Sequence, residues 1–375
     1  MGIYLLVLGT ICLLGAAIEY GKSRGLTSVW LIGKKERVFY KLDVLWLVIL
    51  LILVLFGGLR YKVGTDYDSY CTIFVNLYED WNDILYGGTE RGYVWLNRIV
   101  TLYTNDPQWI IFITNAVVSC LGVHCLRKYC KFAPFGLYIF FTTQYYYSFN
   151  LIRQGMAAAF ILLAFCYARD RKWIHSMVVC LVASLFHQTA LMMIPVLLLM
   201  QFRYQPAWYF VFFAVAALCT LLREQITYFL IATFYPNNLN YAQAYAYDFS
   251  PVQVALCAIY MILCLLYYRI MLRREKGNML YINFSILIFG IYSFFFWIPM
   301  WSRLNLYFIG LYALIVPEAV SCENEKKTRA LYYAVMLGIL LFFYIMPSFV
   351  GTDAYSYTSV FSRPADYLSQ LYTPQ

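Results

Sequence analysis

Long apolar runs recur along almost the whole of this chain, and they constrain its fold more than any other feature. Runs such as 3–20 and 42–58 are about as long as a helix that crosses the hydrocarbon of a membrane. Of the 375 residues, 63% are hydrophobic and only 13% are charged, which excludes a soluble globular domain of ordinary composition. The sequence therefore predicts an all-α, polytopic integral membrane protein with a single transmembrane domain that covers residues 1–375.

The apolar pattern predicts about twelve membrane passes. We place them near residues 3–20, 42–58, 108–125, 134–149, 152–168, 173–186, 188–201, 207–222, 252–268, 279–297, 304–320 and 330–347. Alternate loops together hold 20 of the 28 Lys and Arg residues, so these loops are predicted to be cytoplasmic. The predicted cytoplasmic loops are 21–41, 126–133, 169–172, 202–206, 269–278 and 321–329. Both termini are then external, together with loops 59–107 and 223–251 and the tail 348–375.

The segment 173–201 also admits a single long helix, since no Gly or Pro marks a bend near His187. One pass there would erase the charge bias of the loops, so we expect two short passes. Each has about 14 residues and would extend about 21 Å, against a hydrocarbon thickness of about 30 Å. The turn that carries His187 is therefore expected to lie below the outer surface, packed in protein.

Charge and cysteine content exclude several other classes of protein. The net charge of +9 comes from short basic clusters between apolar runs, which indicates membrane topology and no nucleic acid. The eleven cysteines lack metal or redox spacing and are expected to be small buried residues. Lys22 and Arg24 follow the first run and nothing positive precedes it, so this run is expected to be a retained helix. Without a nucleotide-binding loop, chemistry on a cytoplasmic nucleotide is disfavoured.

The first external polar cluster follows the pass that ends in Gly57-Gly58. Arg60 can place two donors on a phosphate, and Asp66 can orient or deprotonate a sugar hydroxyl. Tyr67 and Tyr70 are further candidate substrate contacts in this run. The alternative is an arginine that reaches the interface beside an ordinary turn. Asp66 also begins an Asp-x-Asp pair, which is too weak a signal to predict a metal site.

The second cluster places Asn150, Arg153 and Gln154 at the outer end of a predicted helix. Small residues follow at Ala157 and its neighbours, so other helices can approach closely. The start of a helix also presents free backbone N–H groups and partial positive charge, which favour a phosphate. We expect this cluster to bind or act on an anionic substrate.

His187 and Arg303 are predicted on the same outer side. A buried, neutral histidine that bonds to the backbone is the ordinary alternative for His187, and interface anchoring beside Trp297 and Trp301 is the alternative for Arg303. The external segment 235–247 contains asparagines and tyrosines of the kind that contact sugars, although an aromatic belt explains them equally well.

Several short motifs are recognisable in order. They are Arg60-x3-Gly64-Thr65-Asp66-Tyr67-x2-Tyr70, Glu90-Arg91-Gly92-Tyr93, Ile152-Arg153-Gln154-x2-Ala157, Phe186-His187-x2-Ala190 and Arg303-x3-Tyr307. Together they resemble the EpsG family of Wzy-type polysaccharide polymerases, although Thr189 stands where a serine is expected. The resemblance implies a glycosyltransferase of the bacterial cytoplasmic (inner) membrane that joins undecaprenyl-diphosphate-linked oligosaccharide repeats on its outer face, building exopolysaccharide, capsule or O-antigen.

That chemistry suggests a role for each candidate residue. Arg60, Arg153 and Arg303 would stabilise the leaving diphosphate in the transition state. His187 is the first candidate for the base that deprotonates the acceptor hydroxyl, and Asp66 is the second. Asn150 and Gln154 would orient donor oxygens. No cofactor is expected, and the expected partners are the lipid-linked oligosaccharide, the lipid bilayer, and the flippase and chain-length regulator of the same pathway.

Three other functions remain open at this stage. A glycan ligase uses nearly the same chemistry, and a flippase for lipid-linked oligosaccharide also binds a diphosphate. A membrane acyltransferase could use an arginine and a histidine, but its acyl donor comes from the cytoplasm.

Overall fold

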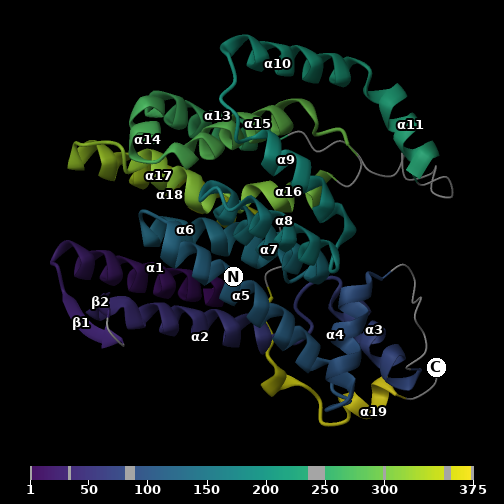
Figure 1. Cartoon of the computed structure of the whole chain (residues 1–375). Helices are drawn as coiled ribbons and strands as arrows, with labels where there is room; N and C mark the ends of the chain where they lie inside the picture. The colour runs from purple at the N-terminus through teal and green to yellow at the C-terminus, as the bar shows by residue number, and fades with distance from the viewer. Residues whose placement is uncertain are drawn as a thin grey trace.

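Helices of very different lengths make up most of the structure, a computed structural model that describes residues 2–32, 35–80, 89–234, 250–298, 301–349 and 356–372 (Figure 1). The α-helices are α1 (Gly2–Ser23), α2 (Leu45–Gly58), α3 (Tyr67–Glu79), α4 (Arg91–Thr101), α5 (Gln108–Tyr129), α6 (Ala133–Phe140), α7 (Ile152–Arg169), α8 (Trp173–Ser184), α9 (Met193–Leu199), α10 (Pro206–Leu221), α11 (Arg223–Phe234), α13 (Pro251–Leu266), α14 (Tyr268–Arg274), α15 (Met279–Phe294), α16 (Trp301–Ile309), α17 (Tyr312–Val320), α18 (Lys326–Phe349) and α19 (Tyr367–Leu371). Shorter helical turns are η1 (Lys41–Val44), η3 (Phe141–Tyr145), η4 (Gln188–Met192), η6 (Lys276–Asn278) and η8 (Val360–Ser362). The predicted all-α polytopic membrane class is confirmed.

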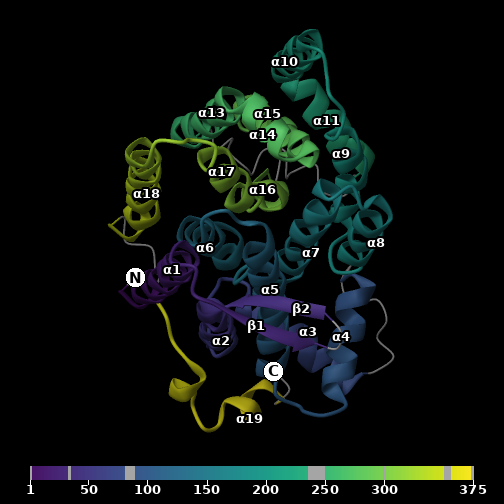
Figure 2. The same ribbon diagram turned by 60° about the vertical axis from the view of Figure 1, so that its left-hand side comes forward.

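One small sheet departs from the purely helical expectation. In the predicted cytoplasmic loop 21–41, β1 (Thr27–Ile32) pairs with β2 (Lys35–Tyr40) as an antiparallel hairpin. Figure 2 shows this hairpin as a pair of arrows beside the helices. The loop holds β-branched and aromatic residues such as Val29, Trp30 and Phe39, which favour strands.

Length and apolarity alone identify fewer spans than the twelve predicted. Among the described residues, four helical segments are long and apolar enough to cross a membrane, and two bent pairs raise the number to six if each pair is one span. The four are Gly2–Ser23, Lys41–Gly58, Gln108–Tyr129 and Lys276–Phe294. The other predicted passes are also helical over most of their length. Two of them are the bent pairs, and the apolar helices Trp173–Ser184, Gln188–Leu199 and Leu304–Val320 are shorter. Outward-facing apolar side chains such as Leu13 and Phe210, which are 73% and 76% exposed, suit contact with lipid.

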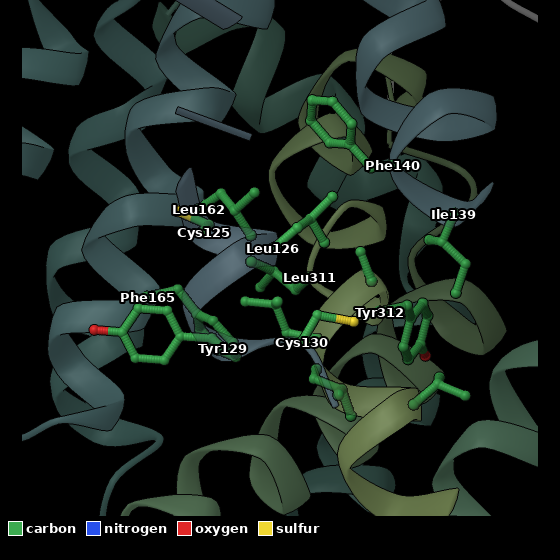
Figure 3. Packing of buried hydrophobic residues seen from close by; sticks show 14 of the residues in the cluster. Cys125, Leu126, Tyr129, Cys130, Ile139, Phe140, Leu162, Phe165, Leu311 and Tyr312 are labelled. Atoms are coloured by element: carbon green, nitrogen blue, oxygen red, sulfur yellow. The ribbon is translucent and has the colours of Figure 1, made fainter. Parts of the chain in front are cut away.

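Helix α7 lies at the centre of the helix assembly and packs against α5, α8 and α16. Ala157, Ala158 and Ala159 are all buried, so the backbones of neighbouring helices approach closely. Figure 3 shows side chains of α5, α6, α7 and the start of α17 meeting in the core, among them Leu126 and Leu162. This packing fixes the position of the first turn of α7, where the second polar cluster lies.

The chain reverses direction at His187, so 173–201 is not one continuous helix. Residues from the start of α8, including Trp173, line a shallow crevice together with Gln201, which follows α9. Cys180 and Ile194 line it further along. The two helices are therefore antiparallel, and His187 is at the tip of their hairpin.

The loops gather at two ends of the helix assembly. At one end, contacts link the predicted cytoplasmic loops; they include Arg127 with Asp43 (3.3 Å), Tyr129 with Asp170 (2.7 Å), Arg169 with Asn278 (3.4 Å) and Arg274 with Ser321 (2.9 Å). At the other end, the ring of Tyr4 near the N-terminus lies 6.0 Å from that of Tyr357 in the C-terminal tail. Both termini thus lie at the end that carries His187, and the membrane face to which this end belongs stays a prediction.

Candidate active site

Glu90 joins two of the predicted site residues, although the sequence analysis assigns it no role. It lies at the start of α4 and is 9% exposed. Its Oε1 atom is 2.6 Å from Nδ1 of His187, and Nη1 of Arg153 donates to its Oε2 atom. Three elements meet at this Glu90 cluster (Glu90, Arg153 and His187): the start of α4, the first turn of α7 and the tip of the α8–α9 hairpin.

A glycine brings α4 close to that hairpin. The backbone N–H of Gly92 donates to the carbonyl oxygen of Leu185 at 2.9 Å. A Cβ atom at position 92 would lie 2.6 Å from the same oxygen, closer than real contacts allow. Because only glycine fits without movement, Gly92 fixes the distance between Glu90 and His187.

The electrostatics of the cluster keep Glu90 ionised. Burial opposes ionisation, but the hydrogen bond with His187 and the charge of Arg153 together outweigh it and lower the pKa of Glu90 below 4.5. An ionised carboxylate only accepts hydrogen bonds, so the proton between the two residues belongs to Nδ1 of His187. In a neutral imidazole bonded in this way, the other ring nitrogen, Nε2, carries the lone pair that can accept a proton.

The three side chains of the cluster differ in their exposure to solvent. The side chains of Arg153 and His187 are 27% and 21% exposed, whereas that of Glu90 is 8% exposed. The carboxylate therefore lies behind the arginine and the histidine, which both reach solvent. A substrate at this surface meets the guanidinium and the imidazole first.

Tyr70 borders the cluster. Its ring packs edge-on against Tyr93 of α4 at 5.8 Å, and its hydroxyl lies next to Arg153. Burial raises the pKa of Tyr70 even though Arg153 acts in the opposite direction, so the hydroxyl stays protonated and able to donate.

Gln154 and the helix of Arg303 meet on the other side of the first turn of α7. The hydroxyl of Tyr307 on α16 lies 2.9 Å from Oγ1 of Thr189, and the buried Gln154 also interacts with Tyr307. Arg303 is one helical turn before Tyr307, on the same face of α16. The side chain of Arg303 lies outside the described residues, and so does the whole segment 235–247 for which sugar contact was predicted.

Asn150 holds the turn before α3. Its Oδ1 atom accepts from the backbone N–H of Thr65 at 2.9 Å, beside Gly64, whose φ of +102° favours glycine. Asp66 follows this turn, and Oγ1 of Thr65 lies 3.4 Å from it. Among the hydrogen bonds and ion pairs of the described residues, none joins Asp66 to the Glu90 cluster.

Arg60 lies in the interior at the end of α2. It is 1% exposed, its guanidinium donates to the carbonyl oxygens of Gly57 (2.5 Å) and Phe149 (3.5 Å), and it stacks over the ring of Phe149 at 4.5 Å. Tyr67 is equally buried and donates to Oε1 of Gln108 at 2.7 Å. Both side chains hold the corner between α2, α3 and α5, so direct contact with a substrate stays a prediction for each.

The structure thus brings together Arg153, His187, Tyr70, Gln154 and the helix of Arg303, and it places Asn150, Arg60 and Tyr67 in supporting positions. Glu90 could have been found from the sequence, because it begins the motif Glu90-Arg91-Gly92-Tyr93 that contributes to the family resemblance. Among the described residues, no group of three His, Cys, Asp or Glu side chains is placed to hold a metal ion.

A family model named EpsG family matches residues 43–359, which is most of the chain. The chain belongs to the EpsG family. The match includes every residue of the Glu90 cluster as well as Arg303. No curated protein and no solved structure is significantly similar to this EpsG-family chain. Membership supports a polysaccharide polymerase that works in a membrane pathway.

Proposed function

We propose that this EpsG-family protein is a membrane glycosyltransferase that joins undecaprenyl-diphosphate-linked oligosaccharide repeats on the outer face of the bacterial cytoplasmic membrane. The observation that carries the proposal is the ionised Glu90, which holds a partly exposed guanidinium and a partly exposed imidazole side by side. A reaction that needs both an anion-binding group and a base matches this pair.

The imidazole supplies the base. As the acceptor hydroxyl attacks the anomeric carbon of the growing glycan, its proton passes to Nε2 of His187. The histidine then carries a positive charge, which the adjacent Glu90 stabilises, as the aspartate does in a Ser-His-Asp triad. In this arrangement Glu90 positions His187, and the half-buried Asp66 is the second candidate for the base.

The guanidinium receives the leaving group. The bond between the anomeric carbon and the diphosphate breaks, and its electron pair leaves with the diphosphate on the lipid carrier. The negative charge that develops on the diphosphate in the transition state is stabilised mainly by Arg153. The first turn of α7 has no side chain that caps it, so its backbone N–H groups add to the attraction for phosphate. Gln154 lies on the neighbouring side, close to the helix that carries Arg303. Both residues are proposed to complete the contact, together with Tyr70. Arg60, Tyr67 and Asn150 are proposed to join it after a local opening.

The test is the lipid-linked glycan of a deletion strain that carries each variant. Arg153→Ala and His187→Ala are expected to abolish polymer and to leave single lipid-linked repeats, with the protein still inserted. Arg127→Ala is the control for loss of an arginine, since Arg127 is half exposed in a surface ion pair with Asp43. His175→Ala is the control for loss of a histidine, since His175 is exposed on α8, the helix that leads to the hairpin tip. Both controls should make normal polymer.

The same experiment separates the alternatives. Normal polymer length in both site variants would refute the site. Full-length polymer that stays on the lipid carrier in the deletion strain would indicate a ligase. Repeats confined to the inner leaflet would indicate a flippase, and intact chain length with loss of acyl groups would indicate an acyltransferase.

A further inference from the structure

A second charged cavity lies at the opposite end of α7 from the Glu90 cluster. Helix α7 has 18 residues, which at 1.5 Å per residue separates its two ends by about 27 Å. The cavity has a volume of about 240 Å³ and is open to solvent. Its lining includes Arg171, Lys276, Trp173 and Gln201, which come from three separate parts of the chain.

Two cations line this cavity and no carboxylate does. Asp170 is the nearest acid in the sequence to Arg171, but it accepts from the hydroxyl of Tyr129 at 2.7 Å and lies 3.5 Å from Arg169. Glu275, next to Lys276, also acts on Arg169. The positive charges of Arg171 and Lys276 can therefore attract an anionic ligand.

Arg171 adopts a backbone conformation that costs free energy. Its φ is +59°, in the left-handed region that glycine usually occupies. The N–H groups of Arg171 and Lys172 donate to the carbonyl oxygens of Ala168 (2.9 Å) and Tyr167 (2.8 Å), which is the Schellman ending of a helix. Glycine would suit this position better, so an arginine here indicates that the side chain has a use.

The loop that carries Lys276 is held in place. A Cβ atom on Gly277 would lie 2.0 Å from the carbonyl oxygen of Arg169, so the loop packs directly on the end of α7. Asn278 donates to the carbonyl oxygen of Met271 (3.0 Å) and to Oε1 of Glu318 (3.1 Å). Lys276 therefore faces Arg171 from a fixed backbone.

An apolar crevice continues from the cavity. The crevice between α8 and α9 shares Trp173 and Gln201 with the cavity, and the rest of its lining is Ser176, Met177, Cys180, Ile194, Leu197 and Leu198. This crevice is closely packed, with no room for a water molecule, so it forms an apolar wall beside the cavity. A basic cavity beside an apolar wall at a helix end fits a lipid with a negatively charged headgroup.

We propose that this cavity binds the headgroup of an anionic phospholipid, with its phosphate between Arg171 and Lys276 and its acyl chains against the exposed apolar side chains of α8 and α9, such as Ile174 and Leu199. The lipid would hold together the open end of the hairpin whose tip carries His187. The proposal does not depend on the reaction proposed above, because it concerns binding at the other end of α7.

The test is binding of phosphatidylglycerol and phosphatidylcholine to the purified full chain by native mass spectrometry. Phosphatidylglycerol should bind more tightly, and Arg171→Gln with Lys276→Gln should weaken it about tenfold or more while leaving phosphatidylcholine unchanged. The control is Lys326→Gln with Lys327→Gln, which removes two exposed cations outside the cavity. Equal loss in both double variants would mean diffuse surface attraction and would overturn the proposal. Competition by inorganic phosphate alone, or tighter binding of a polyprenyl phosphate, would assign the cavity to that ligand instead.

Arg171→Gly separates binding from folding. It removes the cation and relieves the strained backbone, so the melting temperature without added lipid should stay the same or rise while phosphatidylglycerol binding falls. A lower melting temperature with unchanged lipid binding would show that the arginine serves the fold alone.

Discussion

Nδ1 of His187 lies 2.6 Å from Oε1 of Glu90, although 97 positions separate the two residues in the sequence. The same carboxylate pairs with Arg153, so one buried anion sets the position of both groups that reach solvent. Removing its charge should affect the histidine and the arginine together.

Glu90→Gln keeps the size of the side chain but removes its charge. We expect polymerisation to fall about 100-fold or more, because His187 loses the anion that stabilises its protonated form and Arg153 loses its ion pair. The measurement is the rate of glycan extension on a lipid-linked acceptor in membranes with equal amounts of protein. Glu79→Gln is the matched control, since Glu79 is exposed at the end of α3 in the same loop. Wild-type rates in the Glu90 variant would show that the cluster is only structural.

The lowered pKa of Glu90 also predicts how stability depends on pH. A carboxylate whose pKa is lower in the folded protein stabilises it above the unfolded pKa, and this contribution is lost as the pH falls through the folded pKa. The difference in melting temperature between wild type and Glu90→Gln should therefore shrink as the pH falls below about 4.5. A difference that already shrinks between pH 8 and pH 6 would mean that Glu90 titrates with a raised pKa.

Gly92→Ala tests whether the spacing between α4 and the hairpin matters. The added methyl group would meet the carbonyl oxygen of Leu185, so α4 must move away and carry Glu90 away from His187. We expect at least a tenfold loss of glycan extension in a protein that still inserts, because small displacements of catalytic groups have large effects on rate. Gly9→Ala is the control, since a methyl group there meets nothing within 4 Å. Full activity of the Gly92 variant would mean that the hairpin adjusts freely.

The sequence predicted the helices well because each apolar run carries its own signal. It also predicted the chain reversal at His187, since the charge bias of the loops depends on it. The sequence did not predict the helices within loop 59–107, because α3 and α4 are amphipathic and too polar to read as membrane passes. The structure shows that these two helices carry Tyr70 and Glu90 to the site.

The sequence could group the polar residues by side but could not assign their partners. Arg153 and His187 were predicted to lie on the same side. The sequence did not indicate that Glu90 lies between them, because Glu90 and Arg153 are 63 positions apart in the chain. Arg60 was expected to face a phosphate, and that contact stays a prediction; its guanidinium bonds to carbonyl oxygens inside the protein, a partner that the sequence did not indicate. A single sequence carries no signal that separates an arginine facing a substrate from one that supports a corner.

Asn150 tests this distinction between substrate contact and support. If its main role is to accept from the N–H of Thr65, Asn150→Ala should destabilise the protein by about 0.5 to 1.5 kcal/mol, since it removes one hydrogen bond from an exposed turn. Asn150→Asp keeps the accepting oxygen and should retain most of that stability. Melting temperatures of both variants, measured beside their rates of glycan extension, make the comparison. A large loss of rate with unchanged melting temperature in Asn150→Ala would favour direct contact with the donor.

The C-terminal tail closes over the corner that contains Arg60. The N–H of Tyr61 donates to Thr358 and that of Val360 donates to Leu59, both at 2.9 Å, so the tail pairs with the chain on either side of Arg60. Further along, Arg363 lies 2.8 Å from a carboxylate oxygen of Asp106. The tail therefore ties the end of α2 to the start of α5.

A double-mutant cycle on Arg363 and Asp106 measures how strongly the tail is held. Arg363→Gln and Asp106→Asn should each lower the melting temperature, and the cycle should give a coupling of about 0.5 to 1 kcal/mol, because both side chains are largely buried. The same cycle on Arg127 and Asp43 is the control, and the half-exposed arginine of that pair predicts a coupling near zero. Equal coupling in the two pairs would mean that burial beneath the tail adds nothing, and the tail would then be held by its backbone pairing alone.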